Sequence, residues 1–244
     1  MKEEIPRKAG ASLASDTPRE RWFHTAAFAG VLLLAPWLTA WQNAGFARWG
    51  ALTLVSAAGL LNILYQDWLT PRHPKMNLAI LWLVINTGLG VFAGFTSNWY
   101  MPILVVLAAI LWIFGPRLAQ RPVEQQLLPV IGYGLAPFLL SIVLYTTAEG
   151  GLFLPALAWP AVTLVVIAAV ELMPGITRGP IRLTIVIGVA VVLFLIAVPW
   201  AHLPIMTLIL PVLALVVAMM PQSKPWWAGV IVTLGSLVYC LLIR

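Results

Sequence analysis

Residues 78–95 read LAILWLVINTGLGVFAGF and contain no Asp, Glu, Lys or Arg. At 1.5 Å per residue, about 20 apolar residues cross the hydrocarbon core of a bilayer, so this stretch predicts a transmembrane helix. Eight more apolar segments follow the same pattern and are bounded by charges, prolines and tryptophans. They run approximately over 23–41, 47–65, 100–115, 127–146, 152–172, 181–199, 201–220 and 226–243.

The composition of the chain supports the same class of protein. Of its 244 residues, 61% are hydrophobic and 9% are charged, with a mean hydropathy of +0.97. Soluble domains carry roughly 25% charged residues, because a surface that faces water needs them. We therefore predict an all-α polytopic membrane protein of about nine transmembrane helices. A polar tail would occupy residues 1–21 and the helical bundle residues 22–244.

Charge and cysteine content exclude other classes. The net charge of +6 sits in the loops between apolar runs and not on one basic face, so nucleic acid is not an expected partner. The single cysteine, Cys240, can form neither an internal disulfide nor a cysteine metal site. Residues 1–21 are too charged for a signal peptide, which leaves a cytoplasmic tail or a docking arm for a partner.

The distribution of basic residues predicts the orientation. If the N-terminus lies in the cytoplasm, the cytoplasmic segments hold twelve Lys and Arg residues and the outer segments hold two, Arg48 and Arg244. Cytoplasmic loops of membrane proteins carry such an excess. We expect an integral protein of the bacterial inner (cytoplasmic) membrane, with the N-terminus inside and the C-terminus outside.

Two cytoplasmic loops stand out from the others. The loops at 66–77 and 173–180 follow the second and sixth apolar segments and are rich in Pro, Gly and basic residues. This spacing indicates two four-helix units followed by a ninth helix. Repeats of this kind usually place a binding site at the interface between the units.

These loops carry the motifs of a known family. Residues 62–75 read NILYQDWLTPRHPK, and residues 171–184 read ELMPGITRGPIRLT. With nine helices and a cytoplasmic N-terminus, they resemble the UbiA superfamily of intramembrane prenyltransferases, whose first motif reads Asn-Asp-x-x-Asp-x-x-x-Asp before Arg and Pro. Asn62 matches this motif, and Arg72 and Lys75 echo its basic end. Its three aspartates fall on Ile63, Gln66 and Thr70, with Asp67 one residue out of register.

The resemblance implies a site without its full set of acids. Members of the family ionise a prenyl diphosphate, and clusters of carboxylates hold the Mg²⁺ that neutralises the leaving group. This chain offers one carboxylate at each loop, Asp67 and Glu171. Two acids do not make a convincing pair of metal sites, so the resemblance implies a degenerate site, and we assign no catalytic residue and no metal ligand.

Basic residues surround the expected cytoplasmic mouth of this site. They either bind a lipid phosphate or another anion, or act as positive-inside anchors. His24, His73 and His202 lie near segment ends, where a structural role is expected in preference to a haem or chlorophyll ligand. The candidate ligand-binding residues are Asn62, Asp67, Arg72, Lys75, Glu171, Arg178 and Arg182.

Three functions remain open from the sequence. The leading hypothesis is a non-catalytic UbiA-like protein that binds an isoprenoid lipid, quinone or pigment, or that scaffolds a photosynthetic or respiratory complex. Its partners would be membrane lipids and other membrane subunits. The rival is an active, divergent prenyltransferase that uses Asp67 and Glu171 with Mg²⁺. The third is a small transporter, which would need mid-membrane charges that the sequence does not reveal.

Overall fold

The computed structural model describes residues 17–72, 74–119, 122–173, 176, 179–201, 205–220 and 225–242. Over these residues the chain is helical and contains no strand. Six of the described helices are long and apolar enough to cross a membrane, and three shorter apolar helices accompany them. These are the features of an integral membrane protein. The six long spans are Pro18–Gln42, Trp49–Arg72, Met76–Phe95, Met101–Leu118, Leu127–Glu149 and Pro155–Leu172.

Each of the nine predicted apolar segments coincides with helical structure in the described residues. Several spans are composed of consecutive helical pieces of different type. In chain order the elements are α2 (Pro18–Gln42), α3 (Trp49–Leu64), η1 (Tyr65–Leu69), η2 (Thr70–Arg72), α4 (Met76–Phe95), α5 (Met101–Leu118), α6 (Pro122–Val130), η3 (Ile131–Leu135), α7 (Ala136–Glu149), η4 (Leu154–Leu157), α8 (Ala158–Leu172), α9 (Gly179–Ala201), α10 (Ile205–Ala218) and α11 (Pro225–Leu242).

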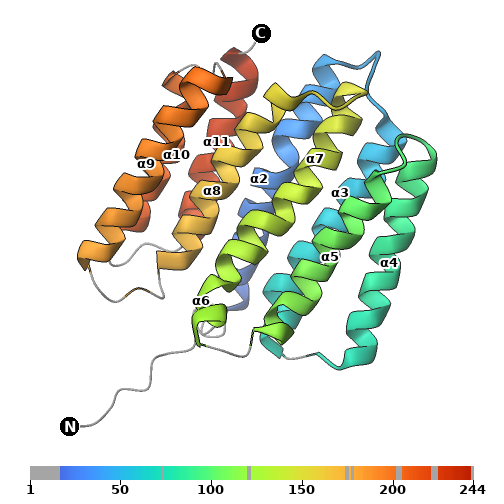
Figure 1. Ribbon diagram of the computed structural model, residues 1–244, viewed down its shortest axis with the longest axis horizontal. Helices are drawn as coiled ribbons and strands as arrows, with labels where there is room; N and C mark the ends of the chain where they lie inside the picture. Colours follow the sequence, from blue (N-terminus) through green and yellow to red (C-terminus); the bar gives the residue numbers. More distant parts are fainter. Residues whose placement is uncertain are drawn as a thin grey trace.

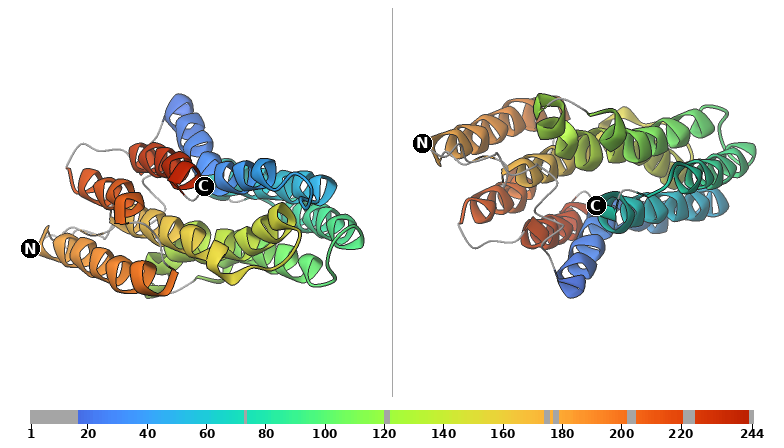
Figure 2. Two further views of the ribbon diagram at one scale, coloured as in Figure 1. Left: turned by 90° about the horizontal axis from the view of Figure 1, so that it is seen from above. Right: turned by 90° about the horizontal axis from the view of Figure 1, so that it is seen from below.

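The helices run up and down along one common direction (Figure 1). α2 begins at the lower end in that view, and α11 ends at the upper end. α4 forms one edge of the bundle and α9 the other, as the views from above and below also show (Figure 2). α2 packs against α11, α7 and α3, while α8 packs against α9, α10 and α11. α2, α7 and α8 therefore lie at the centre, between the two edges.

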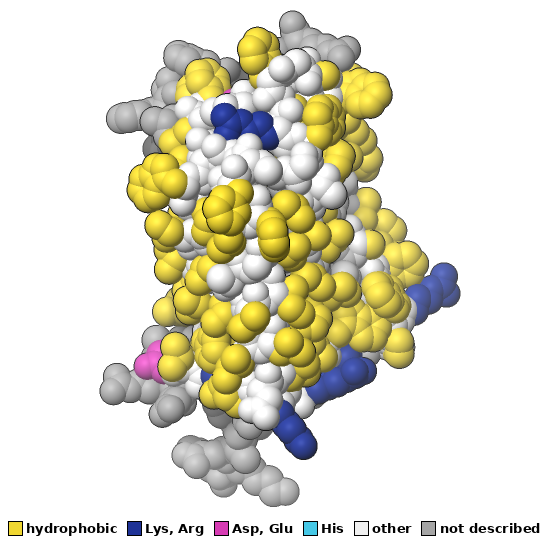
Figure 3. All heavy atoms as spheres, turned by 90° about the vertical axis from the view of Figure 1, so that its right-hand side faces the viewer, with side chains coloured by type: hydrophobic (Ala, Val, Ile, Leu, Met, Phe, Trp, Pro, Cys, Tyr) yellow, Lys and Arg dark blue, Asp and Glu magenta, His cyan; other side chains and the backbone are white. Residues whose placement is uncertain are grey.

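The outer surface of the bundle is apolar. In α4, 22% of the apolar window is buried, against 61% in Pro155–Leu172, so α4 exposes most of its side chains. Large apolar residues such as Leu81, Val84 and Phe92 lie on this exposed surface. Figure 3 shows a broad belt of yellow hydrophobic side chains on one face of the bundle, with most of the blue Lys and Arg side chains on this face gathered below it. Lipid is the solvent that suits such a belt.

Two five-residue π-helices interrupt the spans. η1 continues α3, and η3 connects α6 to α7. A π-helix bonds residue i to i+5, so it holds one residue more than an α-helical turn, and such turns occur frequently at functional sites. The two π-helices lie beside each other. The distance from Nε2 of Gln66 in η1 to a Cβ placed on Gly132 in η3 would be 2.9 Å. The backbone carbonyl of Gly132 accepts a 2.7 Å hydrogen bond from the Trp112 indole.

Candidate functional site

The site begins with the way α2 starts. Thr17 caps the helix, since its hydroxyl accepts from the backbone N–H of Glu20, and the Glu20 carboxylate accepts from the backbone N–H of Thr17. This reciprocal pattern is a capping box, and Pro18 suits the first helical position. The cap fixes where α2 begins, and its second turn carries His24 and Thr25, which are both 5% exposed.

Asp67 lies at the centre of the site and is 0% exposed. Its Oδ2 atom contacts Nδ1 of His24 at 3.0 Å and accepts a 2.8 Å hydrogen bond from the Thr25 hydroxyl. Its Oδ1 atom accepts a 3.0 Å hydrogen bond from the Tyr133 hydroxyl. Asp67 belongs to η1 and Tyr133 to η3, so both π-helices contribute to this cluster. Both oxygens of the carboxylate are occupied by groups of the protein itself.

His24 bridges Asp67 to a second carboxylate. Its other ring nitrogen, Nε2, lies 2.8 Å from Oε1 of Glu171, at the end of α8. The side chains of His24 and Glu171 are each 6% exposed. The imidazole therefore stands between two acids that lie 104 positions apart in the chain (171 − 67). We name His24, Asp67 and Glu171 the His24 bridge.

Hydrogen-bond counting sets the charge of the His24 bridge. A neutral imidazole has one N–H, yet both ring nitrogens contact a carboxylate oxygen. Two protons are needed to fill these two contacts. Either the ring carries both protons, or the ring carries one and a carboxyl group carries the other. Both arrangements give the three side chains a net charge of −1.

Aromatic residues cover the bridge. The ring of Tyr133 meets the imidazole edge to face, with centroids 5.4 Å apart. The Trp68 indole donates a 3.3 Å hydrogen bond to the Thr25 hydroxyl, and its ring lies 4.8 Å from that of Trp22. These large side chains exclude lipid and water from Asp67. An ion pair in such a site interacts more strongly than one in water.

A small void adjoins the bridge between α2, α8 and α11. Its volume is about 10 Å³, which is the lower limit for one water molecule. One lining residue, Trp226, has an indole N–H that is buried without a partner among the described residues. A water in the void would therefore lie among polar groups. The void is lined by His24, Ala27, Phe28, Ile167, Glu171, Trp226 and Gly229.

The structure brings two of the predicted site residues together, Asp67 and Glu171, through His24. Asn62 lies elsewhere: it is fully buried and donates a 2.8 Å hydrogen bond to Oδ1 of Asn86 on α4. Arg72 and Lys75 are exposed, and neither forms an ion pair with Asp67 or Glu171 among the described residues.

Of the remaining predicted basic residues, the structure describes Arg182. Arg182 donates a 2.7 Å hydrogen bond from Nε to the carbonyl of Ile176. Arg178, together with His73 and His202, lies outside the residues that the structure describes. Among the described residues, the base that contacts the two acids is His24, an inward-facing histidine.

Sequence reasoning did not single out Thr25 or Tyr133, and it gave His24 a structural role. His24 and Asp67 are 43 positions apart, and His24 and Glu171 are 147 apart, so no local spacing reveals them. A weak signal was present at Tyr133, because the glycines on both sides of it allow a neighbouring helix to approach. A Cβ on Gly134 would stand 3.1 Å from Cβ of Ala168.

Mg²⁺ does not fit the arrangement of the acids. A hard cation needs free oxygen ligands that converge on one point. Here the imidazole stands between the two carboxylates, and both oxygens of Asp67 already accept hydrogen bonds. In the described part of the chain, no group of three or more His, Cys, Asp or Glu side chains is arranged to hold a metal ion.

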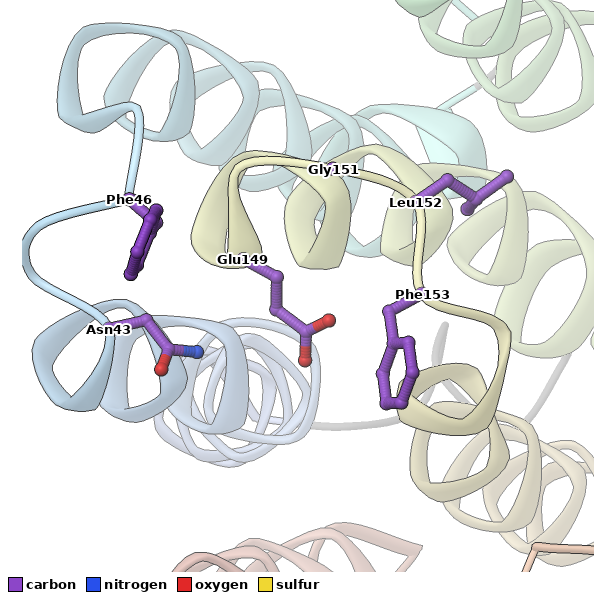
Figure 4. A pocket seen from close by; sticks show the side chains of 6 residues that line it. All are labelled: Asn43, Phe46, Glu149, Gly151, Leu152 and Phe153. Carbon is purple, nitrogen blue, oxygen red and sulfur yellow. The ribbon is translucent and has the colours of Figure 1, made fainter.

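A second polar cavity lies at the opposite end of α2 and α7. It is a shallow depression of about 420 Å³ into which the Glu149 carboxylate points (Figure 4). Gly150 follows with φ = 75°, and a Cβ there would stand 2.6 Å from the carbonyl oxygen of Phe46, so a glycine is required. The cavity is lined by Asn43, Phe46, Glu149, Gly151, Leu152 and Phe153.

Comparison of the chain with models of protein families, with curated proteins and with solved structures finds no match. The function must therefore be argued from the site itself.

Proposed function

We propose that the chain is a non-catalytic, UbiA-like integral membrane protein. It would bind an isoprenoid lipid, quinone or pigment tail, or hold other membrane subunits in a larger complex. One observation carries the non-catalytic part of the proposal. Asp67, the acid that the rival mechanism needs for Mg²⁺, is completely buried, and both its oxygens are occupied by His24, Thr25 and Tyr133.

The balance of charge supports this proposal. A prenyl diphosphate leaves with close to three negative charges, and metal ions held by carboxylates would have to neutralise them. The His24 bridge has a net charge of −1, and its acids are already paired with an imidazole. To bind Mg²⁺, the protein would have to break three hydrogen bonds to Asp67, all inside a site that excludes water.

The one-residue offset of Asp67 from the family motif has a physical counterpart in this proposal. The motif places an aspartate where this chain has Gln66, and Asp67 follows it directly. Both residues lie in η1, whose extra residue shifts the facing of every side chain after it. In a degenerate relative, an acid of the motif could persist one position away, as Asp67 does, with its side chain turned toward α2.

We further propose nine crossings with the N-terminus in the cytoplasm. Six helices are long enough to span, and the three shorter apolar helices, Pro180–Leu193, Met206–Ala218 and Trp226–Leu242, would supply the rest. An odd number of crossings agrees with the start of α2 and the end of α11 at opposite ends of the bundle (Figure 1). The end with most of the basic side chains in Figure 3 would face the cytoplasm.

The proposal is tested by purifying the protein from native membranes and assaying transfer of a labelled prenyl chain with and without Mg²⁺. We expect no Mg²⁺-dependent transfer, together with co-purifying lipid or membrane subunits. Transfer that is lost in both Asp67→Asn and Glu171→Gln, and retained in the control Glu149→Gln, would establish the active enzyme instead. Glu149 is a suitable control because it is an acid at the opposite end of the bundle.

A small transporter is a second candidate, and the His24 bridge favours it. Ionisable groups inside membrane helices often mark ion or proton pathways. The bridge joins α2 and η1, from the first predicted four-helix unit, to Glu171 of α8, from the second. Purification separates the two candidates, because a transporter would run without partner subunits and would retain proton-driven uptake of a substrate in vesicles.

A further inference from the structure

We propose that the His24 bridge is a proton-binding site that exchanges its proton with the end of the bundle where α2 begins. The bound proton would hold α2 and α8 together. This inference rests on the geometry of the bridge and does not depend on whether the protein is a scaffold, an enzyme or a transporter.

The two carboxylates of the bridge are held unequally. Asp67 receives hydrogen bonds from Thr25 and Tyr133 in addition to its contact with His24. For Glu171, His24 is the hydrogen-bond partner found among the described residues. Three groups of the protein thus contact Asp67, whereas the contact of Glu171 with His24 lies at the side of the bridge that adjoins the void.

The proton balance gives two states. With two protons in the bridge, each ring nitrogen shares one with a carboxylate, and the net charge is −1. When one proton leaves, the N–H bond at Nε2 breaks and its electron pair stays on the ring. The imidazole is then neutral and keeps one N–H, which remains on the Asp67 side. The lone pair on Nε2 now faces the Glu171 carboxylate at 2.8 Å, so this contact is repulsive and opens.

The void offers a place for a proton acceptor. It is lined by His24 and Glu171, and its volume of about 10 Å³ is the lower limit for one water molecule, which would accept the proton from Nε2. Asp67, by contrast, does not line the void and is 0% exposed. Glu171 is the residue before the last in α8, so the void lies near the end of that helix.

The charged and titratable groups around His24 come from each packed element. η1 contributes Asp67, η3 contributes the Tyr133 hydroxyl, and α8 contributes Glu171. α11 contributes the uncharged indole of Trp226, and α2 itself contributes Thr25. Among the described residues the ring thus faces two acids and no base, and these acids favour the state with the extra proton.

The bridge matters for packing because α2 and α8 contact each other over a short stretch. Both helices make more extensive contacts with α11, which lies between them on one side. Opening of the Glu171 contact would therefore separate two central helices without breaking the rest of the bundle. Loss or binding of one proton at this site would change the local distance between α2 and α8.

The experiment follows the protonation of His24 directly. The full chain, with His73→Gln and His202→Gln, would be labelled with ¹⁵N in its remaining histidine and placed in lipid bilayers. Nitrogen NMR would then count the ring protons between pH 5 and pH 10. We expect two protons on the ring or shared with its acids at the acidic end, and loss of the one at Nε2 as the pH rises.

Two variants test whether Glu171 raises the proton affinity of the His24 ring. Glu171→Gln removes one of the two negative charges that hold the second proton, so the proton affinity of the ring should fall by about tenfold or more. The matched variant Glu149→Gln alters an acid at the far end and should leave the affinity unchanged. A His24 ring that carries the same protons over the whole range, or equal effects of both variants, would overturn the proposal. If Glu171→Gln does not fold, the measurement on the unaltered bridge still decides.

Discussion

The hydroxyl of Tyr133 donates a 3.0 Å hydrogen bond to Oδ1 of Asp67 in a site closed to water. Removal of this donor in Tyr133→Phe leaves a buried carboxylate oxygen without its partner. Hydrogen bonds to charged groups contribute about 1.5–3 kcal/mol, so the free energy of unfolding in detergent should fall by about that amount. Chemical or thermal unfolding followed by circular dichroism measures it.

A matched tyrosine provides the control. The hydroxyl of Tyr100 has a long contact, 3.5 Å, with the amide of Asn98 in the turn before α5, far from any buried charge. Tyr100→Phe should therefore change the stability by less than about 0.5 kcal/mol, as most substitutions away from buried polar networks do. Equal losses in the two variants would show that Asp67 does not depend on Tyr133.

At this scale, the sequence identified the acids but not their partners. Asp67 and Glu171 stood out because they lie in the two stretches that resemble the family motifs and because acids are rare in this chain. His24 and Tyr133 carried no such mark, since an aromatic or a histidine near a segment end is ordinary. Their roles depend on which faces of α2 and η3 turn inward, and these rotations are set by tertiary packing and by a π-helix.

Among the helices, the α4–α5 hairpin shows how glycine permits close approach. A Cβ on Gly94 would stand 2.7 Å from Cγ of Pro102, whose ring cannot move aside, whereas a Cβ on Gly88 meets nothing within 4 Å. Gly94→Ala should therefore force the helices apart and cost about 1–3 kcal/mol relative to Gly88→Ala, by overpacking. Both variants gain helix propensity, so their difference reports the contact.

The measurement is a pair of unfolding curves recorded in the same detergent. Gly88→Ala is expected to equal the unaltered protein or to exceed its stability, by up to about 1 kcal/mol. If the two variants were equally stable, the hairpin would not depend on the approach of Gly94 to Pro102.

The helices themselves were largely predictable from the sequence. Each apolar segment became helical because a chain in lipid must satisfy its backbone hydrogen bonds internally. The internal composition of the spans was not predictable. The segment 127–146 contains parts of α6, η3 and α7, and no apolar pattern distinguishes a π-helical turn such as η3 from the α-helix around it.

For the whole molecule, the proposed nine crossings can be tested with single cysteines. In a Cys240→Ser background, a single cysteine would replace either Phe46 or Lys75. Both residues are exposed, and they flank the two ends of the span Trp49–Arg72. A maleimide that cannot cross membranes should label the Phe46 position in intact cells. It should label the Lys75 position only after permeabilisation, because the proposed orientation places the basic end in the cytoplasm.

The labelling pattern distinguishes a reversed orientation of the bundle from a second span that does not cross the membrane. The reverse pattern would show that the bundle is inserted with the opposite orientation. Labelling of both positions from the same side would show that the second span, Trp49–Arg72, does not cross the membrane. The cysteine-free parent provides the background signal for both measurements.

The two π-helices also affect how this chain can be compared with others. Each adds one residue to a helical turn. The residues after η1 therefore face directions that are shifted by one position from those of a regular α-helix. In an ungapped alignment with a chain that has a regular α-helix at residues 65–69, the residues on one side of η1 would be paired one position out of register. Any search for relatives should therefore permit a single-residue insertion at this point, and another at residues 131–135, where η3 shifts the frame again.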